Sequence, residues 1–158
     1  MQLDLDRIER SVGELEVIVD GNITKIDVRT VCNIDTQDLM EEFTKHAGYY
    51  AWYSTVLALY ESRKKDLEFK IDVKYAELDL EVRASYTPEE KKSLKEKNID
   101  SRVTVNGDYM ALQEEYLSCS SVVRRLVALV KGLEVKSNML QQVGARARKE
   151  MELDSSGR

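Results

Sequence analysis

The feature that most constrains this chain is a heptad pattern in its C-terminal third. From Tyr109 to Met151, apolar or small residues alternate at spacings of three and four over about six heptads. The positions are Tyr109, Leu112, Tyr116, Cys119, Val123, Leu126, Val130, Leu133, Ser137, Leu140, Gly144, Ala147 and Met151. A helix of this length runs for roughly 60 Å, too far to bury its apolar side within a small compact domain. It needs a second long helix, another copy of the chain, or both.

A second long helix is predicted from about residue 36 to about residue 84. Its three-and-four pattern uses Leu39, Phe43, Ala47, Tyr50, Leu57, Tyr60, Leu67, Ile71, Tyr75, Leu78 and Val82. Asp35 or Thr36 is suited to cap its N-terminus, and Asp38 adds an acidic residue to its first turn. Because the two helices match in length, we expect them to pair as an antiparallel hairpin.

The N-terminal region favours a small β-hairpin. Residues 14–20 and 23–31 alternate and are rich in β-branched side chains, and Gly21-Asn22 between them is a turn signal. A lone hairpin is marginally stable, so it has to pack on the helices or on another subunit.

A shorter connecting helix is predicted from Thr87 to about Val105. Thr87 is suited to cap it, Pro88 to occupy its first position and Glu90 to complete a capping box. Residues 99–105 are also compatible with a strand, because their end is β-prone. Asp108 is expected to cap the final helix.

The predicted fold class is therefore mainly α, a long antiparallel helical hairpin or coiled coil that forms oligomers. Residues 1–33 are expected to form an acidic arm with the β-hairpin, and residues 34–154 the helical core. Residues 155–158 are expected to be a flexible tail or a remnant of an expression vector.

Composition and motifs argue against membrane, secreted, metal-binding and enzymatic proteins. Charged residues make up 34% of the chain and there is one proline, as in long-helix proteins. No apolar run is long enough to span a membrane and the first residues do not resemble a signal peptide, so a cytoplasmic protein is expected. Cys32 and Cys119 lack metal-ligand spacing, and we expect no metal and no cofactor. The single histidine, His46, has no nucleophile near it in sequence, and no phosphate-binding glycine loop is present, so no enzyme activity is expected.

Charge is distributed unevenly along the chain. The net charge is −5, but residues 1–42 contain eleven acidic and four basic residues. The remaining residues are slightly basic. Such an acidic arm suits a basic partner or competition with an anionic ligand, although a solvated arm is the simpler explanation.

Aromatic residues gather in three turns of the first long helix. They are Tyr49, Tyr50, Trp52, Tyr53 and Tyr60. Helical geometry prevents all of them from facing one partner, so this cluster is predicted to form an oligomer interface. The alternative is a platform on which single-stranded bases stack.

Basic residues mark both long helices as candidates for binding nucleic acid. The candidates are Lys64, Lys65, Lys70, Lys74, Arg83, Arg124, Arg125, Lys131 and Lys136. Between Tyr116 and Lys149 the only acidic residue is Glu134. Repeated around an oligomer, such a face becomes a positive track for phosphates; the alternative is an ordinary solvated helix face.

The order of these features resembles the UvsY-like family of phage recombination mediators. Ile34-Asp35-Thr36 precedes Tyr49-Tyr50-Ala51-Trp52, a lysine-rich helix from Arg63 to Arg83, and a Lys/Glu-rich connector from Glu90 to Lys97. Asp108-Tyr109 then opens a long helix that ends in Gly144-Ala145-Arg146-Ala147-Arg148-Lys149-Glu150. The resemblance covers roughly residues 33–152.

This resemblance implies a ring-shaped homo-oligomer of helical subunits without a catalytic site. It implies binding of single-stranded DNA, a single-strand-binding protein and a RecA-type recombinase, whose loading the mediator assists. Lys74 and Arg83 are the bases nearest to the family's DNA-contacting pair. The alternative hypothesis is a structural or adaptor coiled coil, such as a virion component, that does not bind nucleic acid. A third is an inhibitor whose acidic arm mimics DNA.

Overall fold

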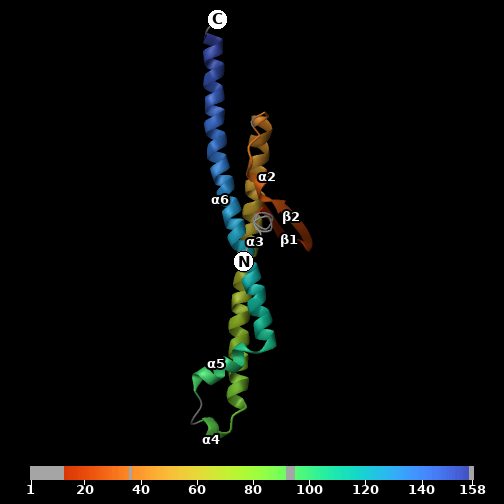
Figure 1. Cartoon of the computed structure of the whole chain (residues 1–158), viewed down its shortest axis with the longest axis vertical. Helices are drawn as coiled ribbons and strands as arrows, with labels where there is room; N and C mark the ends of the chain where they lie inside the picture. The colour runs from red at the N-terminus through yellow and green to blue at the C-terminus, as the bar shows by residue number, and fades with distance from the viewer. Residues whose placement is uncertain (1–12, 36, 92–94, 157–158) are drawn as a thin grey trace, which may run out of the picture. The chain divides into compact units, whose positions relative to one another are not determined.

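The computed structural model describes residues 13–35, 37–91 and 95–156 and is mainly helical, as predicted (Figure 1). A two-stranded antiparallel hairpin precedes the helices. In chain order the elements are β1 (Glu14–Val19), β2 (Asn22–Asp27), α2 (Val28–Cys32), α3 (Leu39–Ala84), α4 (Pro88–Lys91), α5 (Glu96–Thr104) and α6 (Gly107–Ser156). Residues 155 and 156, predicted to be a tail, belong to α6, whereas 157 and 158 lie outside the described residues.

The described residues form two compact units, and α3 and α6 run through both. Unit 1 comprises Met1–Ala58 and Val122–Arg158, and unit 2 comprises Leu59–Ser121. Within unit 1 the Tyr50 hydroxyl donates to Glu134 at 3.3 Å, and within unit 2 the Cys119 thiol lies 3.6 Å from the Tyr60 carbonyl oxygen. In each unit, residues later in α3 contact residues earlier in α6, as in the pairs Arg63–Glu115 and Lys74–Asp108 of unit 2. The two helices are therefore antiparallel within each unit. The described part of the predicted N-terminal arm belongs to unit 1, with the start of α3 and the end of α6.

The hairpin is shorter than predicted. Asp20 and Gly21, with φ of 50° and 77°, make its turn, one residue before the predicted Gly21-Asn22, since a two-residue hairpin turn of this kind needs positive φ at both positions. The second strand ends at Asp27 instead of residue 31. The Asp27 carboxylate accepts the backbone N–H groups of Arg29 and Thr30, at 3.0 and 3.3 Å, and so caps α2.

In unit 1, α6 is buried along two stripes. The predicted heptad pattern supplies one, with Leu126, Leu133 and Leu140 almost fully buried. The second, Arg125, Leu129, Gly132 and Lys136, faces the N-terminal segment. We call it the N-terminal stripe of α6.

Three contacts define the N-terminal stripe. The Arg125 guanidinium donates to the Glu14 carbonyl oxygen, and the Lys136 ammonium donates to the Val31 carbonyl oxygen at 3.2 Å. At Gly132 a Cβ atom would lie 3.0 Å from the Cys32 sulfur, so glycine lets α2 approach closely. The stripe therefore packs against β1 and α2.

The first turns of α3 differ from the prediction. The Asp38 carboxylate, rather than Asp35 or Thr36, caps the helix by accepting the Glu41 N–H at 2.9 Å. Asp35 accepts the Gln37 N–H just before it, and Thr36 lies outside the described residues.

The predicted seam was wrong at several positions in the first half of α3. Tyr60 is buried as predicted, but the other buried residues there, His46, Tyr53 and Val56, were not in the predicted seam. The predicted seam residues Phe43, Ala47 and Tyr50 are exposed instead. From Leu67 onward the predicted pattern is confirmed, because Leu67, Ile71 and Leu78 are buried.

The connection between the long helices in unit 2 comprises two helices, α4 and α5, instead of the single helix predicted from Thr87 to about Val105, because the backbone at Lys95 is extended. The predicted capping box is confirmed: Glu90 accepts the Thr87 N–H at 2.9 Å, and the Thr87 hydroxyl accepts the Glu90 N–H at 3.4 Å. The strand alternative for residues 99–105 is wrong, because Glu96–Thr104 is helix α5. The spacing of apolar residues also predicts that Leu94 faces inward with Ile99 and Val103, but Leu94 lies outside the described residues.

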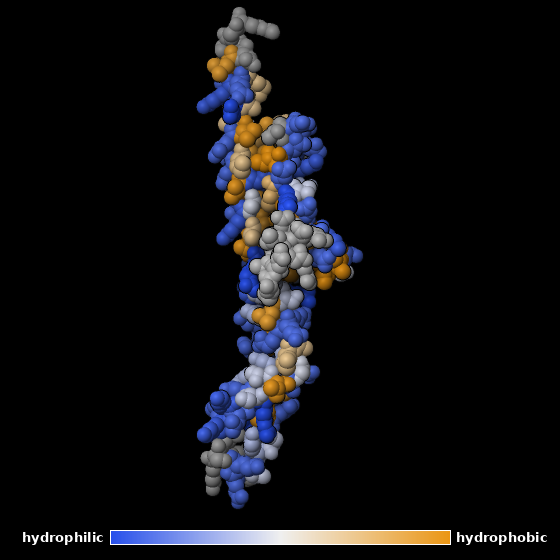
Figure 2. All heavy atoms as spheres, in the orientation of Figure 1, coloured by the Kyte–Doolittle hydropathy of each residue, from blue (hydrophilic) through white to orange (hydrophobic). Residues whose placement is uncertain are grey.

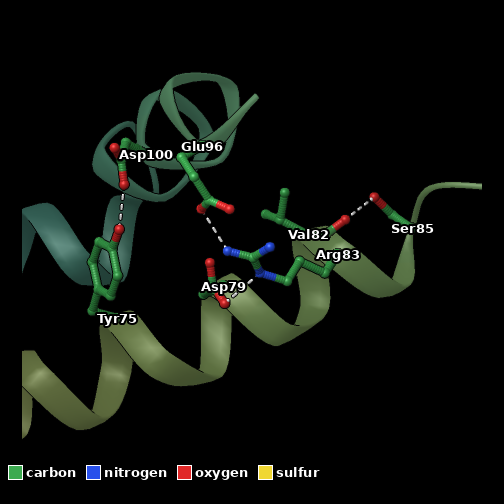
Figure 3. A network of polar contacts seen from close by, with 7 residues as sticks. All are labelled: Tyr75, Asp79, Val82, Arg83, Ser85, Glu96 and Asp100. Atoms are coloured by element: carbon green, nitrogen blue, oxygen red, sulfur yellow. Dashed lines mark hydrogen bonds and ion pairs between the residues drawn. The ribbon is translucent and has the colours of Figure 1, made fainter. Parts of the chain in front are cut away.

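Helix α5 is held on the end of α3 by apolar and polar contacts. Ile99 and Val103 are buried in a cluster with Leu78. Figure 3 shows the polar contacts beside it, where the Tyr75 hydroxyl donates to Asp100 and the Arg83 guanidinium bridges Asp79 and Glu96. The hydrogen bond to the Asp100 carboxylate raises the pKa of Tyr75 to about 12.

The cap of α6 is Asn106, not Asp108 as predicted. Its side-chain oxygen accepts the N–H groups of Asp108 and Tyr109, at 3.0 and 3.2 Å. Asp108 lies in the first turn, where its carboxylate pairs with Lys74 of α3 at 3.3 Å.

None of the helices in the described part of the chain combines the length and apolar character that crossing a bilayer requires.

Candidate nucleic-acid interface

The outer face of α6 in unit 1 carries a row of exposed basic side chains. Arg124 and Lys131 lie two positions before the buried Leu126 and Leu133. Two positions are about 200° around a helix, so both bases point away from the heptad stripe. Lys149 continues the same row, and Arg146 lies beside it; both are exposed. We call these four bases the outer basic face of α6.

Few acidic side chains oppose this face. Glu134 is the only acidic residue between Tyr116 and Lys149, and its carboxylate accepts a hydrogen bond from Tyr50. Arg146 pairs with Glu150 at 3.0 Å, but its side chain is 82% exposed, so water screens that pair strongly. The face can therefore attract an extended anion such as a phosphate backbone.

Two of the predicted bases on α6, Arg125 and Lys136, contact other groups of unit 1 instead of joining the outer basic face. The Lys136 side chain is only 3% exposed, and its ammonium lies 2.8 Å from the Glu42 carboxylate. The Arg125 side chain turns to the Glu14 carbonyl. Lys136 does not fit the predicted contact with DNA, because an ammonium held inside unit 1 cannot reach a phosphate without breaking its ion pair.

The predicted bases of α3 lie in unit 2 and are mostly matched by acids or rings. Lys74 pairs with Asp108, and Arg83 with Asp79 and Glu96. The Lys64 ammonium lies over the Tyr116 ring, 5.6 Å from its centre. Lys65 and Lys70 are exposed, with Asp66, Glu68 and Asp72 between or beside them in sequence. This stretch therefore presents mixed charge.

The predicted aromatic cluster divides between core and surface. Tyr53 and Tyr60 are 6% and 7% exposed, so they pack inside the chain. Burial raises the pKa of Tyr53. Tyr49, Tyr50 and Trp52 are each about two-fifths exposed. Of the predicted cluster, only these three residues are exposed enough to contribute to an oligomer interface or to stack on bases.

Sequence reasoning counted Arg146 and Lys149 among the basic residues of the last helix but did not select them as site residues. Their signal was available in the spacing: Arg124, Lys131 and Lys149 are separated by seven and eighteen residues, which are close to whole numbers of helical turns. Knowing which side of α6 stays exposed was needed to select them.

A second polar group lies inside unit 1 but shows no catalytic arrangement. Glu42, His46 and Lys136 come together there, and all three side chains are largely or fully buried. His46 Nδ1 has no hydrogen-bond partner among the described residues. No group of three or more His, Cys, Asp or Glu residues in the described part of the chain is arranged to hold a metal ion.

His46 makes the stability of unit 1 depend on pH. Burial, and secondly the Lys136 ammonium, lower the pKa of His46 below its ordinary value of 6.5. As pH falls through about 6.5, the unfolded chain binds a proton there first, so stability present above that pH is lost. We expect urea unfolding to show a smaller free energy at pH 5.5 than at pH 7.5.

The matched variant for this prediction is His46→Gln, which has no titrating group. Its free energy of unfolding should change less between the two pH values than that of the unaltered chain. Equal changes in both proteins would contradict a lowered pKa of His46 in the folded state.

An apolar hollow lies where the start of α3 meets the end of α6. Leu39, Met40, Phe43, Gly144 and Met151 help to line it, and Figure 2 shows apolar side chains at the surface in this region. A Cβ atom at Gly144 would lie 3.2 Å from the Phe43 ring, so glycine keeps the two helices close.

Comparison of the chain with protein-family models, with curated proteins and with solved structures finds no match.

Proposed function

We propose that this chain is a non-enzymatic protein that binds single-stranded DNA and acts as a recombination mediator. The observation that carries the proposal is the outer basic face of α6, where Arg124, Lys131, Arg146 and Lys149 are exposed on a helix whose sequence has one acidic residue, Glu134, between Tyr116 and Lys149. Resemblance to the UvsY-like mediators supplies the partners: a RecA-type recombinase, a single-strand-binding protein and further copies in a ring.

The physical basis is electrostatic. Each phosphate that meets a lysine or arginine releases a condensed counterion, so affinity falls as salt rises. A row of bases along one helix face suits a backbone that runs along the helix. Such contacts recognise the charge of the strand and not its sequence.

Charge reversal on this face tests DNA binding. We expect Arg124→Glu with Lys131→Glu to weaken binding of a short single-stranded oligonucleotide about 30-fold, or roughly 1 kcal/mol for each lost contact. The slope of log K against log salt should become shallower by about 1.4, because each single-strand contact contributes about 0.7. Fluorescence anisotropy at several salt concentrations measures both.

The matched control is Lys65→Glu with Lys70→Glu, which changes the net charge equally but on the mixed-charge stretch of α3. It should bind the oligonucleotide within about threefold of the unaltered chain if the α6 face is the site. Equal losses in both variants would mean that net charge alone, and not this face, governs binding.

The mediator role has its own test. Filament formation by a RecA-type recombinase on DNA covered by single-strand-binding protein should accelerate when the chain is added. The Arg124→Glu, Lys131→Glu variant should not accelerate it. If the chain binds DNA but does not affect filament formation, the mediator role is contradicted and only DNA binding is supported.

A structural or adaptor coiled coil is the second candidate. It is favoured by large apolar side chains at the surface of α3, where Phe69 and Leu80 are 70% and 68% exposed. That function predicts an oligomer whose affinity for single-stranded DNA at low salt is weaker than about 100 μM, the weak end of non-specific binding.

A further inference from the structure

A second apolar pattern runs along the exposed side of α3 in unit 2. Its positions are Leu59, Ser62, Asp66, Phe69, Val73, Ala76 and Leu80, all apolar except Ser62 and Asp66. They alternate at spacings of three and four, as in a coiled-coil seam. All are exposed, and Leu59, Phe69, Val73 and Leu80 are 55%, 70%, 41% and 68% exposed. We call this set the outer stripe of α3.

The outer stripe lies opposite the buried side of the same helix. Tyr60, Leu67, Ile71 and Leu78 face the interior of unit 2 and are 3–8% exposed. Phe69 precedes Ile71 by two positions, and Leu80 follows Leu78 by two, which turns each about 160° away from that side. The described part of unit 2 therefore leaves the outer stripe uncovered, although a seam of this kind is stable when a second helix covers it.

The charges beside the stripe change sign at its centre. The flanking positions of this heptad before residue 71 are all basic: Arg63, Lys65 and Lys70. The flanking positions after it are all acidic: Asp72, Glu77 and Asp79. A partner helix that fits this edge must be acidic where α3 is basic and basic where α3 is acidic.

One helix that meets this requirement is α3 itself, turned end for end. We propose that the outer stripe of α3 pairs antiparallel with the outer stripe of a second copy of this chain. The basic half of each copy then lies along the acidic half of the other. A parallel pair would place Lys65 beside Lys70 and Asp72 beside Glu77 of the second copy, which are like charges.

The pattern also selects a register. With the twofold axis near residue 71, Phe69 lies opposite Val73 of the second copy, and Leu80 opposite Ser62, so large side chains meet smaller ones. Arg63 then approaches Glu77 of the second copy, and Lys65 approaches Asp79. Near the axis Lys70 meets Lys70 and Asp72 meets Asp72 of the second copy, but moving the register by one heptad in either direction keeps only two of the four opposite-charge contacts.

Some of the charged side chains that flank the outer stripe already form ion pairs within the chain, and others do not. No described residue forms an ion pair with Lys65, Lys70, Asp72 or Glu77, and all four are exposed. Arg63 and Asp79 already contact Glu115 and Arg83 at 2.8 Å, on side chains that are 49% and 23% exposed. Each opposite-charge contact of the register therefore joins an exposed side chain without a described ion pair, Lys65 or Glu77, to Asp79 or Arg63, which shares its charge with its existing partner.

This inference goes beyond the proposed function, because it concerns unit 2 and not the α6 face that would bind DNA. An antiparallel pair is isologous and closes at two copies. A ring would consequently need a further, different contact, to which the exposed Tyr49, Tyr50 and Trp52 of unit 1 are candidates.

Sedimentation of the full chain over a range of concentrations tests the pairing. We expect a dimer, and we expect Phe69→Glu to weaken dimer formation about 100-fold because it places a charge at the seam. Leu117→Glu, at a position on α6 that is 60% exposed, is the matched control and should change dimer formation less than about threefold. A chain that remains monomeric at about 100 μM, or equal effects of the two variants, would overturn the proposal.

Charge exchange tests the electrostatic argument. Lys65→Glu with Lys70→Glu makes the flanks mainly acidic, and Asp72→Lys with Glu77→Lys makes them mainly basic. Each variant alone should dimerise about 30-fold more weakly, and an equimolar mixture should regain dimers with about the affinity of the unaltered chain. Recovery on mixing also shows that both variants fold. A mixture that dimerises no better than its components would contradict the pairing.

Single cysteines test the orientation. In the antiparallel register, Asp66 lies opposite Ala76 of the second copy. Mixing Asp66→Cys with Ala76→Cys should therefore form the mixed disulfide at least about tenfold faster than Asp66→Cys joins to itself. Faster self-joining of Asp66→Cys would indicate a parallel pair and overturn the antiparallel arrangement.

The DNA-binding proposal and the dimer proposal can be tested independently with two variants. The Arg124→Glu, Lys131→Glu variant should lose DNA affinity and keep the dimer. The Lys65→Glu, Lys70→Glu variant should lose the dimer and keep affinity for a short oligonucleotide. Loss of both properties in either variant would overturn the assignment of separate faces.

Discussion

Glu42→Gln is expected to lower the free energy of unfolding by about 3 kcal/mol or more, because it leaves a buried ammonium without its counter-ion. The Lys136 and Glu42 side chains are 3% and 16% exposed, and their charged atoms are 2.8 Å apart. The Val31 carbonyl accepts one hydrogen bond from Lys136, but a carbonyl does not neutralise the charge. Urea unfolding followed by circular dichroism measures the loss.

The neighbouring residue provides the control. Glu41 pairs with Lys45 at 2.6 Å, but these side chains are 56% and 50% exposed. Glu41→Gln should therefore cost less than about 0.5 kcal/mol. Similar costs for the two variants would contradict the burial of the Glu42 pair.

Removing both charges separates burial from pairing. Glu42→Leu combined with Lys136→Met should unfold within about 1.5 kcal/mol of the unaltered chain, since well-packed apolar residues often replace a buried ion pair at little cost. If the double variant were as unstable as Glu42→Gln, the loss would come from packing and not from an uncompensated charge.

Leu129→Ala is expected to cost about 3 kcal/mol, within the range of 2–5 kcal/mol for large-to-small changes at buried positions. Leu129 is 1% exposed, yet it lies outside the heptad pattern of α6. Its neighbours on the N-terminal stripe, Arg125 and Gly132, contact the N-terminal segment, so we expect that segment to cover Leu129 as well. Thermal or urea unfolding measures the change in stability.

The control for this prediction makes the same substitution on the same helix. Leu117 is 60% exposed, and Leu117→Ala should alter stability by less than about 0.5 kcal/mol. Hydrogen exchange adds a local measurement: β1 and β2 amides should exchange faster in Leu129→Ala than in Leu117→Ala. Unchanged exchange in the hairpin would show that Leu129 is buried by other contacts.

The surroundings of α6 in unit 1 connect stability with the proposed function. The helix is covered by α3 along its heptad stripe and by the N-terminal segment along a second stripe. The side that remains open carries Arg124 and Lys131. Docking of the N-terminal segment thus selects which basic side chains of α6 remain available to a phosphate backbone.

Several elements could be predicted because their causes are local. The capping box at Thr87 and Glu90 involves four consecutive residues, and the hairpin turn needs only residues that accept positive φ. The buried leucines of α6 follow a spacing that any two long helices would use.

Other elements could not be predicted because local signals competed. Asp35, Thr36 and Asp38 are all residue types that cap helices, and the hydrogen bond from the Glu41 N–H shows that Asp38 takes this role in α3. The β-prone residues that follow Asp27 became helix α2, since the Asp27 carboxylate accepts two N–H groups there.

The sequence alone determined two long helices, the heptad stripe of α6 and that of the second half of α3. These follow from periodicity, which acts over one or two helical turns. Only the tertiary structure decided which of two similar lysines of α6, Lys131 and Lys136, is exposed and which is buried. Lys136 is buried because α2, more than 100 residues earlier in the chain, packs on its side of α6, and Lys131 is exposed because no described residue covers the other side. Contacts across such a separation depend on how the whole unit packs and leave no periodic signal near either lysine.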